Sequence, residues 1–214
     1  MTPAETASLR AVARSYFDDE LNPAHDWHHV QRVESLAETL LTRTPAADEG
    51  IVRPAVLLHD IGRAREDHGE IADHARWGAQ KARELLDERG FEDDRIDAIC
   101  HAIRVHRYSN AYEPETLEAE LVCDADNLDA LGAVGIARCF TYGGELGETI
   151  YDPDLPPSAD DTAAGATQYN HFYRKILRLT ERMYTDAGRE IAADRHAFVV
   201  DFLDRFDREV DGRR

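Results

Sequence analysis

The sequence predicts an all-α fold, and three observations support this prediction. Apolar residues recur every three or four positions along most of the 214-residue chain, which is the spacing of one face of a helix. The alternation of apolar and polar residues that marks a β-strand is essentially absent. Glycine, proline and capping residues interrupt the apolar stripes at distances typical of helix ends. A chain of this length can form one domain with a sizeable core.

The first half of the chain is expected to form five helices, at residues 3–21, 26–44, 51–61, 71–90 and 96–103. The first should end near Asn22-Pro23. Asp26 can cap the second by accepting a backbone N–H. The third is short and apolar, and Gly62 follows it as a natural helix-ending residue.

The second half is expected to hold three helices and one long loop. Residues 117–140 should form one helix that contains Gly132 and Gly135. The stretch 141–166 is rich in Gly, Pro and Asp and predicts a loop, and loops of that length are usually functional or mobile. The two closing helices are expected at residues 168–187 and 189–210.

The chain is strongly acidic, with 43 Asp and Glu residues against 25 Lys and Arg residues and a formal net charge of −18. Such a surface repels nucleic-acid backbones and anionic membranes, so neither is expected as a partner. Only Lys81 and Lys175 are lysines. Acid excess with so little lysine resembles proteins of salt-loaded cytoplasms, where ionic strength screens the repulsion. An acidic protein encoded by a GC-rich genome is the alternative.

The three cysteines, Cys100, Cys123 and Cys139, form no CxxC pair. Reduced, buried thiols of a cytoplasmic protein are therefore expected rather than a disulfide framework or a thiolate metal site. The sequence shows no N-terminal signal of basic and then apolar residues, and no apolar run near 18 residues.

Imidazoles and carboxylates stand in three apolar helical contexts, at His29, at His59-Asp60 and in the segment 123–129. A buried polar group without a partner costs a few kcal/mol, and an unpaired charge costs more. Two neutral imidazoles and two carboxylates together would neutralise a divalent cation. This N/O donor set suits Mn²⁺, Fe²⁺, Co²⁺, Ni²⁺ or, less well, Mg²⁺. The helical stripe alone does not decide between Asp124 and Asp126, and His29 taken alone could be a packed core histidine.

The order His … His-Asp … Asp resembles the HD superfamily of metal-dependent phosphohydrolases. The phrases HDWHHVQRV, LLHDIG and VCDADNLDALGAVGIAR are similar to a subgroup of small proteins in that superfamily, as are YGGELGETIYDP and the helices after it. The resemblance covers residues 22–212. It implies an HD-domain helical bundle with additional C-terminal helices. A single domain would span residues 1–214, with a metal-binding core at about 22–140, the loop at 141–166 and closing helices at 167–212.

The resemblance implies that one divalent metal ion, with manganese the preferred choice, is held by His29, His59, Asp60 and Asp126. His29 rather than His28 is the ligand, because the pattern Val-x-x-Val follows it as in the family. In the segment Asp-Ala-Asp the family's ligand is the second acid. The subgroup usually has an arginine after that acid, whereas this chain has an asparagine at position 127, which removes a positive charge near the site.

Two further histidines are candidates for catalytic or phosphate-binding roles, with core packing as the alternative. His74 stands four residues before Gly78, as in the His-x-x-x-Gly of two-metal HD enzymes. His106 lies on the same helical side as Ile103. In two-metal relatives a second histidine follows directly, but here the residue is Arg107, which favours one metal.

The remaining candidates are weaker. Arg63 and Arg65 could bind phosphate oxygens through a bidentate fork, although ordinary surface charge is an equal explanation. The Glu66-Asp67 pair is a candidate general base or a solvated turn. The other histidines are expected at the pocket rim or in core packing (His25 and His171) and in solvent (His68 and His101).

The function implied by the resemblance is metal-dependent hydrolysis of a phosphate ester or anhydride in a small substrate, most directly a nucleotide. Asp60 would orient or deprotonate the attacking water, while His74 and His106 would stabilise phosphoryl oxygens. Cleavage of a nucleoside triphosphate to a monophosphate and pyrophosphate is the specific case. The alternatives are an HD-fold di-iron oxygenase, a non-catalytic metal or nucleotide sensor, and a plain helical interaction protein. The sequence indicates no oligomeric state.

Overall fold

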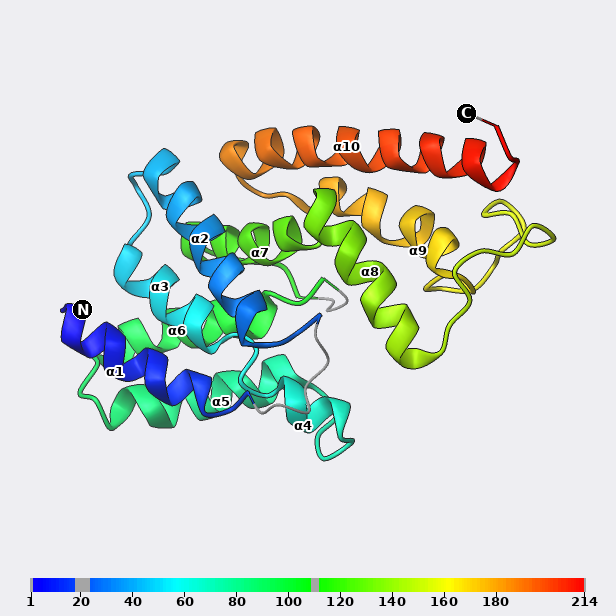
Figure 1. Cartoon of the computed structure of the whole chain (residues 1–214). Helices are drawn as coiled ribbons and strands as arrows, with labels where there is room; N and C mark the ends of the chain where they lie inside the picture. The colour runs from blue at the N-terminus through cyan, green and yellow to red at the C-terminus, as the bar shows by residue number, and fades with distance from the viewer. Residues whose placement is uncertain (1, 18–23, 109–111, 214) are drawn as a thin grey trace. The chain divides into compact units, whose positions relative to one another are not determined.

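The computed structural model describes residues 2–17, 24–108 and 112–213 (Figure 1). Within these ranges the chain forms helices, turns and loops and no β-strand, so the predicted all-α class is confirmed. The chain divides into two compact units, Met1–Asp126 and Asn127–Arg214. No helix in the described ranges has both the length and the apolar composition that a membrane span requires.

The first unit contains six helices in the described part of the chain, and a further helix extends past its end. They are α1 (Pro3–Arg14), α2 (Trp27–Arg43), α3 (Glu49–Leu58), α4 (Arg63–Asp67), α5 (His74–Asp87), α6 (Asp93–Val105) and α7 (Leu117–Asp129). The helix α3 packs against α1, α2, α5 and α6. Val56, Leu57 and Leu58 of α3 are all 0% exposed. Burying each such side chain contributes about 1.5–3 kcal/mol to the stability of the fold. The helix α3 therefore lies at the centre of the hydrophobic core of this unit.

Local signals set most helix starts. Asp26 caps α2, as predicted, by accepting a hydrogen bond from the backbone N–H of His29 at 2.9 Å. Asp48 and Asp73 cap α3 and α5 in the same way. The helix expected at 3–21 ends at Arg14, and residues 18–23 lie outside the described ranges. The short α4 was not predicted, because Gly62 was interpreted only as the end of the preceding helix.

The second unit contains α8 (Gly132–Leu146), α9 (Gln168–Arg174), the 3₁₀ helix η1 (Ile176–Arg182) and α10 (Asp186–Val210). The long α10, drawn from orange to red in Figure 1, packs against α8 and η1. Aromatic rings fill the contact, with Phe140 of α8 lying 5.6 Å from Phe172 of α9 and 6.1 Å from Phe202 of α10, centroid to centroid.

Three predicted boundaries in this half of the chain are wrong. The single helix expected at 117–140 is two helices, because the chain turns after Asp129 and Gly132 adopts a φ of 71°. A side chain at Gly135 would collide with the carbonyl of Ala130. The loop expected to begin at 141 begins at Gly147, because α8 continues to Leu146. The helix expected at 168–187 is α9 followed by η1.

The loop between α8 and α9 is held by a buried carboxylate. Asp160 is 2% exposed. It accepts hydrogen bonds from the backbone N–H groups of Thr162 and Ala166 and from the amide of Asn170, at 2.7–3.0 Å. A hydrogen bond from the Thr162 hydroxyl at 2.6 Å, together with these bonds, keeps the pKa of Asp160 well below its ordinary value. The predicted loop is therefore anchored to the start of α9.

Candidate metal centre

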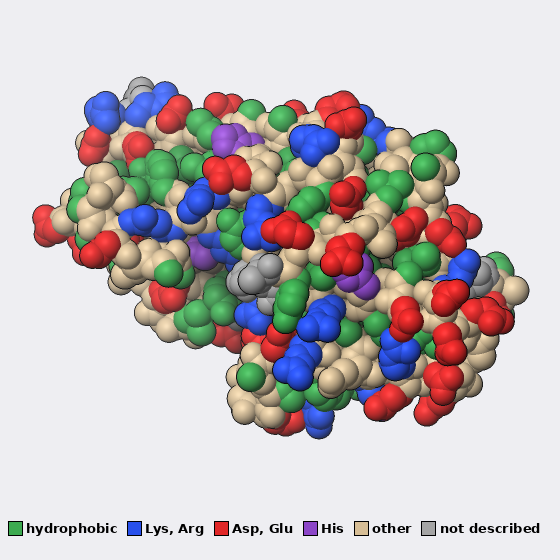
Figure 2. Space-filling view, turned by 180° about the vertical axis from the view of Figure 1, so that it is seen from behind, with side chains coloured by type: hydrophobic (Ala, Val, Ile, Leu, Met, Phe, Trp, Pro, Cys, Tyr) green, Lys and Arg blue, Asp and Glu red, His purple; other side chains and the backbone are tan. Residues whose placement is uncertain are grey.

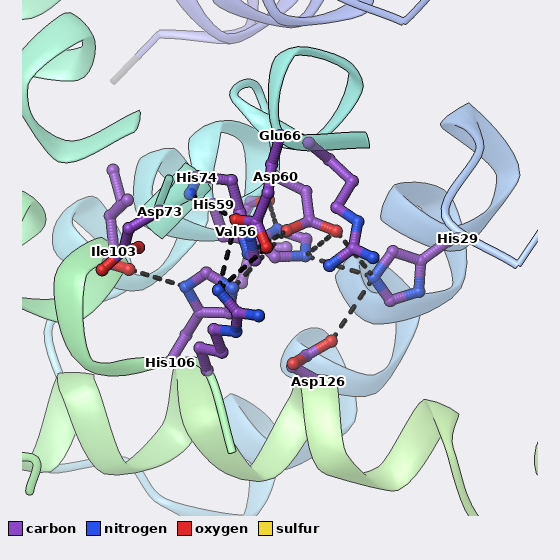
Figure 3. Close-up of polar contacts among 12 residues, drawn as sticks. His29, Val56, His59, Asp60, Glu66, Asp73, His74, Ile103, His106 and Asp126 are labelled. Carbon is purple, nitrogen blue, oxygen red and sulfur yellow. Dashed lines mark hydrogen bonds and ion pairs between the residues drawn. The ribbon is translucent and has the colours of Figure 1, made fainter. Parts of the chain in front are cut away.

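The candidate ligands lie in the first unit and come from four segments of the chain (Figure 3). His29 stands in the first turn of α2, immediately inside the Asp26 cap. His59 and Asp60 directly follow α3, and His106 directly follows α6. Asp126 lies on α7. The three histidines and Asp60 are no more than 4% exposed, whereas the side chain of Asp126 is 22% exposed.

His59 and His106 are oriented by the same local device. Each occupies the C-cap position of its helix, and its ring reaches back to the carbonyl three residues earlier. Nδ1 of His59 is 2.6 Å from the carbonyl oxygen of Val56, and Nδ1 of His106 is 2.6 Å from that of Ile103. A carbonyl only accepts, so Nδ1 donates in both rings. In the neutral ring this leaves the Nε2 lone pair facing the centre.

The atoms that meet at the centre are mostly acceptors. Nε2 of His106 lies 3.5 Å from Oδ1 of Asp60. Nε2 of His29 lies 3.2 Å from Nε2 of His59, 3.4 Å from Oδ1 of Asp126 and 3.6 Å from Oδ2 of Asp60. One N–H on His29 cannot satisfy all three acceptors around it. Figure 3 shows these side chains pointing toward one another.

A divalent cation fits this arrangement. Two overlapping groups of ligand atoms lie close enough to share an ion: His29, His59 and Asp126, and His59, Asp60 and His106. Ligand atoms about 2.1 Å from one ion in octahedral geometry are roughly 3 Å apart, close to the spacings seen here. A cation would turn the acceptor contacts into coordinate bonds, and the donor set of imidazole and carboxylate suits Mn²⁺, Fe²⁺, Co²⁺ or Ni²⁺.

The electrostatics keep these side chains in their ligand forms. Burial lowers the pKa of His59 to about 4, so the ring is neutral at pH 7. Burial alone would raise the pKa of Asp60, but the neighbouring imidazoles of His59, His106 and His74 hold it well below its ordinary value. The pKa of Asp126 is also lowered against the effect of burial, chiefly by hydrogen bonding to His29. Neutral imidazole and ionised carboxylate are the forms that bind metals.

His74 lies behind Asp60 and bonds at both ring nitrogens. Nε2 is 3.1 Å from Oδ1 of Asp60, and Nδ1 is 2.7 Å from Oε2 of Glu66. Burial alone would lower the pKa of His74, but its two carboxylate partners raise it to about 9. Both ring nitrogens therefore donate, and His74 orients Asp60. The predicted phosphate contact of His74 would compete with these two bonds.

Glu66 has a larger structural role than the sequence indicated. Oε2 accepts from the backbone N–H of His74 at 2.6 Å as well as from its ring. Nη1 of Arg107 lies 3.0 Å from Oε1 and 3.2 Å from Oε2. Burial would raise the pKa of Glu66, but these hydrogen bonds and the charge of Arg107 lower it to about 2. Nothing in the local sequence pairs Glu66 with side chains 8 and 41 positions away.

The two arginines predicted to bind phosphate each form an ion pair with a nearby carboxylate. Arg63 forms an ion pair with Asp67 one helical turn later, at 3.1 Å. Arg65 pairs with Glu70 at 3.1 Å, and its guanidinium lies 5.0 Å from the ring centroid of Trp77. The phosphate contact of Arg63 and Arg65 stays a prediction.

The remaining predicted residues are placed as follows. His28 is exposed and bonds to Gln31, and Asp124 is fully buried but belongs to neither group of candidate ligands. The ring of His25 packs 6.0 Å from that of His29. His68 is exposed, as expected, whereas His101 accepts from the backbone N–H of Glu115. In the second unit, His171 bonds to the carbonyl of Ala164, and the amide of Asn127 donates to the carbonyl of Arg182.

The chain is similar to known proteins along most of its length. The HD domain family matches residues 26–131, a range that includes all the candidate ligands. YpgQ of Bacillus subtilis (strain 168), described as an uncharacterized protein, is 34% identical over 212 residues. That alignment covers 97% of this chain and 95% of YpgQ.

Solved structures extend the likeness to the whole chain. A crystal structure from Lactobacillus plantarum has a TM-score of 0.78 with 30% identity and covers 99% of both chains. An HD-superfamily hydrolase from Bacillus thuringiensis has a TM-score of 0.75 with 32% identity and covers 97% of both. YpgQ in complex with ADP has a TM-score of 0.73 with 30% identity, and the match covers 97% of this chain and 98% of YpgQ.

Proposed function

This chain belongs to the HD domain family, and from that membership we propose that it is a metal-dependent phosphohydrolase that acts on nucleotides. The proposal rests on one observation: Nε2 of His29 lies 3.2–3.6 Å from side-chain nitrogen and oxygen atoms of His59, Asp60 and Asp126 in a largely buried cluster. The manganese ion and the role of each residue are parts of the same proposal.

The chemistry asks little of the protein beyond positioning and charge neutralisation. A divalent cation bound to these residues would polarise a phosphoryl oxygen and lower the pKa of water. Asp60 accepts from His74 through Oδ1, so Oδ2 is the atom directed toward His29. Fixing one oxygen in this way orients the carboxylate, and an oriented carboxylate can hold an attacking water or accept its proton.

The nucleotide class is supported by a relative. YpgQ was crystallised with ADP and aligns along nearly the whole of this chain. ADP carries the two features that the proposed site would recognise, a phosphate chain for the cation and an anhydride bond for hydrolysis. Cleavage of nucleoside triphosphates to a monophosphate and pyrophosphate is the specific reaction that we propose to test first.

The experiment compares two isosteric variants that lie two residues apart. Asp126→Asn removes a carboxylate of the candidate centre, whereas Asp124→Asn changes a buried carboxylate outside both ligand groups. We would incubate each protein with Mn²⁺ and a panel of nucleotides, identify the products by chromatography and verify folding by circular dichroism.

The proposal predicts turnover that requires metal and is lost in Asp126→Asn but kept in a folded Asp124→Asn. Nucleotide binding without turnover by the metal-loaded wild type would instead indicate the sensor. Turnover that requires iron and oxygen would indicate the oxygenase.

A further inference from the structure

Arg107 directly follows His106 and keeps one edge of its guanidinium open. Its described contacts are those of Nη1 with the two oxygens of Glu66, at 3.0 and 3.2 Å. Among the described residues, Nε and Nη2 of Arg107 have no hydrogen-bond partner. The side chain as a whole is 29% exposed.

The free edge has the geometry that phosphate recognition uses. Nε and Nη2 of a guanidinium lie in one plane and donate two parallel hydrogen bonds, which match two oxygens of a phosphate. A bond to Glu66 through Nη1 leaves this fork intact. Arg65, by contrast, already donates from Nε to Glu70.

A chain of side chains connects Arg107 to the candidate metal ligands. Glu66 bonds both Arg107 and His74, and His74 in turn bonds Asp60 at 3.1 Å. Nε2 of His106, the covalent neighbour of Arg107, lies 3.5 Å from the same Asp60 oxygen. The guanidinium is therefore held beside the centre by a carboxylate that is itself fixed by two donors from His74.

Resting on the function proposed above, we propose that Arg107 binds a phosphate group of the substrate and that Glu66 is its positioning residue. A substrate whose phosphate chain reaches the cation would place a neighbouring phosphate within the reach of this arginine. The class of ligand is a nucleoside di- or triphosphate, since a single phosphate on the cation would leave the fork unused.

The test measures ADP binding by calorimetry, with and without Mn²⁺, so that it does not depend on turnover. Arg107→Ala should weaken ADP binding by about 10- to 100-fold, as expected for a charge-assisted pair of hydrogen bonds. Arg107→Lys should recover only part of this loss, because lysine keeps the charge without the fork. Arg104→Ala is the matched control, an exposed arginine three residues earlier that contacts Tyr112.

A double variant separates positioning from general damage. If Glu66 acts on ADP through Arg107, then Glu66→Gln weakens binding in the wild type but adds little in the Arg107→Ala background. Additive losses would overturn the positioning role. Mn²⁺ affinity, followed by electron paramagnetic resonance, should be unchanged in Arg107→Ala.

The outcomes distinguish this inference from the proposed function. If the wild type binds ADP and Arg107→Ala binds it within twofold of Arg104→Ala, the phosphate role of Arg107 is overturned while the phosphohydrolase proposal stands. If the metal-loaded wild type neither binds ADP nor hydrolyses any nucleotide, both proposals fail together.

Discussion

At the scale of single residues, the centre is defined by hydrogen-bond roles as much as by residue types. His59 and His106 each donate a hydrogen bond from Nδ1 to a backbone carbonyl. A hydrogen bond of this kind fixes the orientation of a metal-binding imidazole ring. Their Nε2 atoms then face His29 and Asp60 at 3.2 and 3.5 Å. Two acceptors that face one another form no hydrogen bond, so their contact does not stabilise the folded state. A bound cation would stabilise it by accepting both lone pairs.

We therefore expect Mn²⁺ to stabilise the protein against unfolding. At a free concentration 100 times the Kd, binding contributes about 2.7 kcal/mol, which corresponds to a rise in Tm of roughly 5–10 °C for a chain of this size. The rise should disappear in His29→Ala and persist in His28→Ala, which alters the exposed neighbouring ring. Equal shifts in both variants, measured by calorimetry, would place the metal elsewhere.

His74 makes the stability of the metal-free protein depend on pH. Its pKa is raised to about 9 from the ordinary 6.5, so between these values the folded state holds a proton that the unfolded state has lost. The stabilisation is complete below pH 6.5 and is lost as the pH rises toward 9. The free energy of unfolding should fall by about 1 kcal/mol per pH unit in this window.

Urea titrations in the presence of a chelator would measure this slope. His74→Gln keeps polar atoms at the position but cannot titrate, so its stability should be nearly flat between pH 6.5 and 8.5. A slope that survives in His74→Gln would assign the pH dependence to another group. The opposite effect of His59, whose pKa is lowered to about 4, belongs to the window below pH 6.5.

At the scale of elements, the close approach of α5 to the turn after α3 positions His74. A Cβ atom at Gly62 would lie 2.8 Å from the carbonyl oxygen of His74 and 3.0 Å from the ring of Trp77. Only a residue without a side chain lets the first turn of α5 approach Asp60 this closely. Gly62, two residues after Asp60, is thus needed for His74 to reach Asp60.

Gly62→Ala should therefore destabilise the fold by about 1–3 kcal/mol, the usual cost of overpacking, and should weaken Mn²⁺ binding through Asp60. Gly144→Ala is the matched control, because a Cβ there meets nothing within 4 Å and alanine favours the helix. The control should be neutral or slightly stabilising in denaturant titrations. A Gly62→Ala protein as stable as the control would contradict this account of the turn.

The helix break after Asp129 shows where element-level prediction fails. The apolar pattern of residues 117–140 is continuous, and glycines inside it were compatible with one helix. The structure ends α7 at Asp129 and begins α8 at Gly132. In the second unit the side chain of Arg195 packs against Gly132 and donates to the carbonyl of Leu128 at 2.5 Å. A partner 67 positions away, invisible to a local pattern, satisfies the carbonyl that the break exposes.

At the scale of the whole molecule, charge repulsion is the dominant long-range effect. The formal net charge is −18, and acidic side chains are spread over the face shown in Figure 2, with basic side chains interspersed among them. The Debye length falls from about 30 Å at 0.01 M salt to about 3 Å at 1 M. Salt therefore screens the repulsion between acidic groups that lie well beyond contact distance.

We expect the Tm to rise as KCl increases from 0.01 to 1 M, to a similar extent with NaCl. Sucrose at matched osmolality separates screening from solute exclusion, because it leaves charges unscreened. A Tm that stays constant or falls with salt would show that local ion pairs, such as Arg10–Glu34 at 2.6 Å, outweigh the net repulsion. It would also remove the support for a salt-adapted protein.

The sequence by itself determined the helical class, the Asp26 cap and the set of buried imidazoles and carboxylates, because helical periodicity and capping are local properties. Tertiary structure decided the rest. It brought together His29, His59, Asp60 and Asp126, which lie up to 97 positions apart in the chain, and it tied Glu66 to both His74 and Arg107. Which acceptor atoms face one another, and which nitrogens of Arg107 bond to Glu66, depends on how closely the helices approach in space. The spacing of residues along the chain does not encode the distances between helices, so only the folded structure could show these contacts.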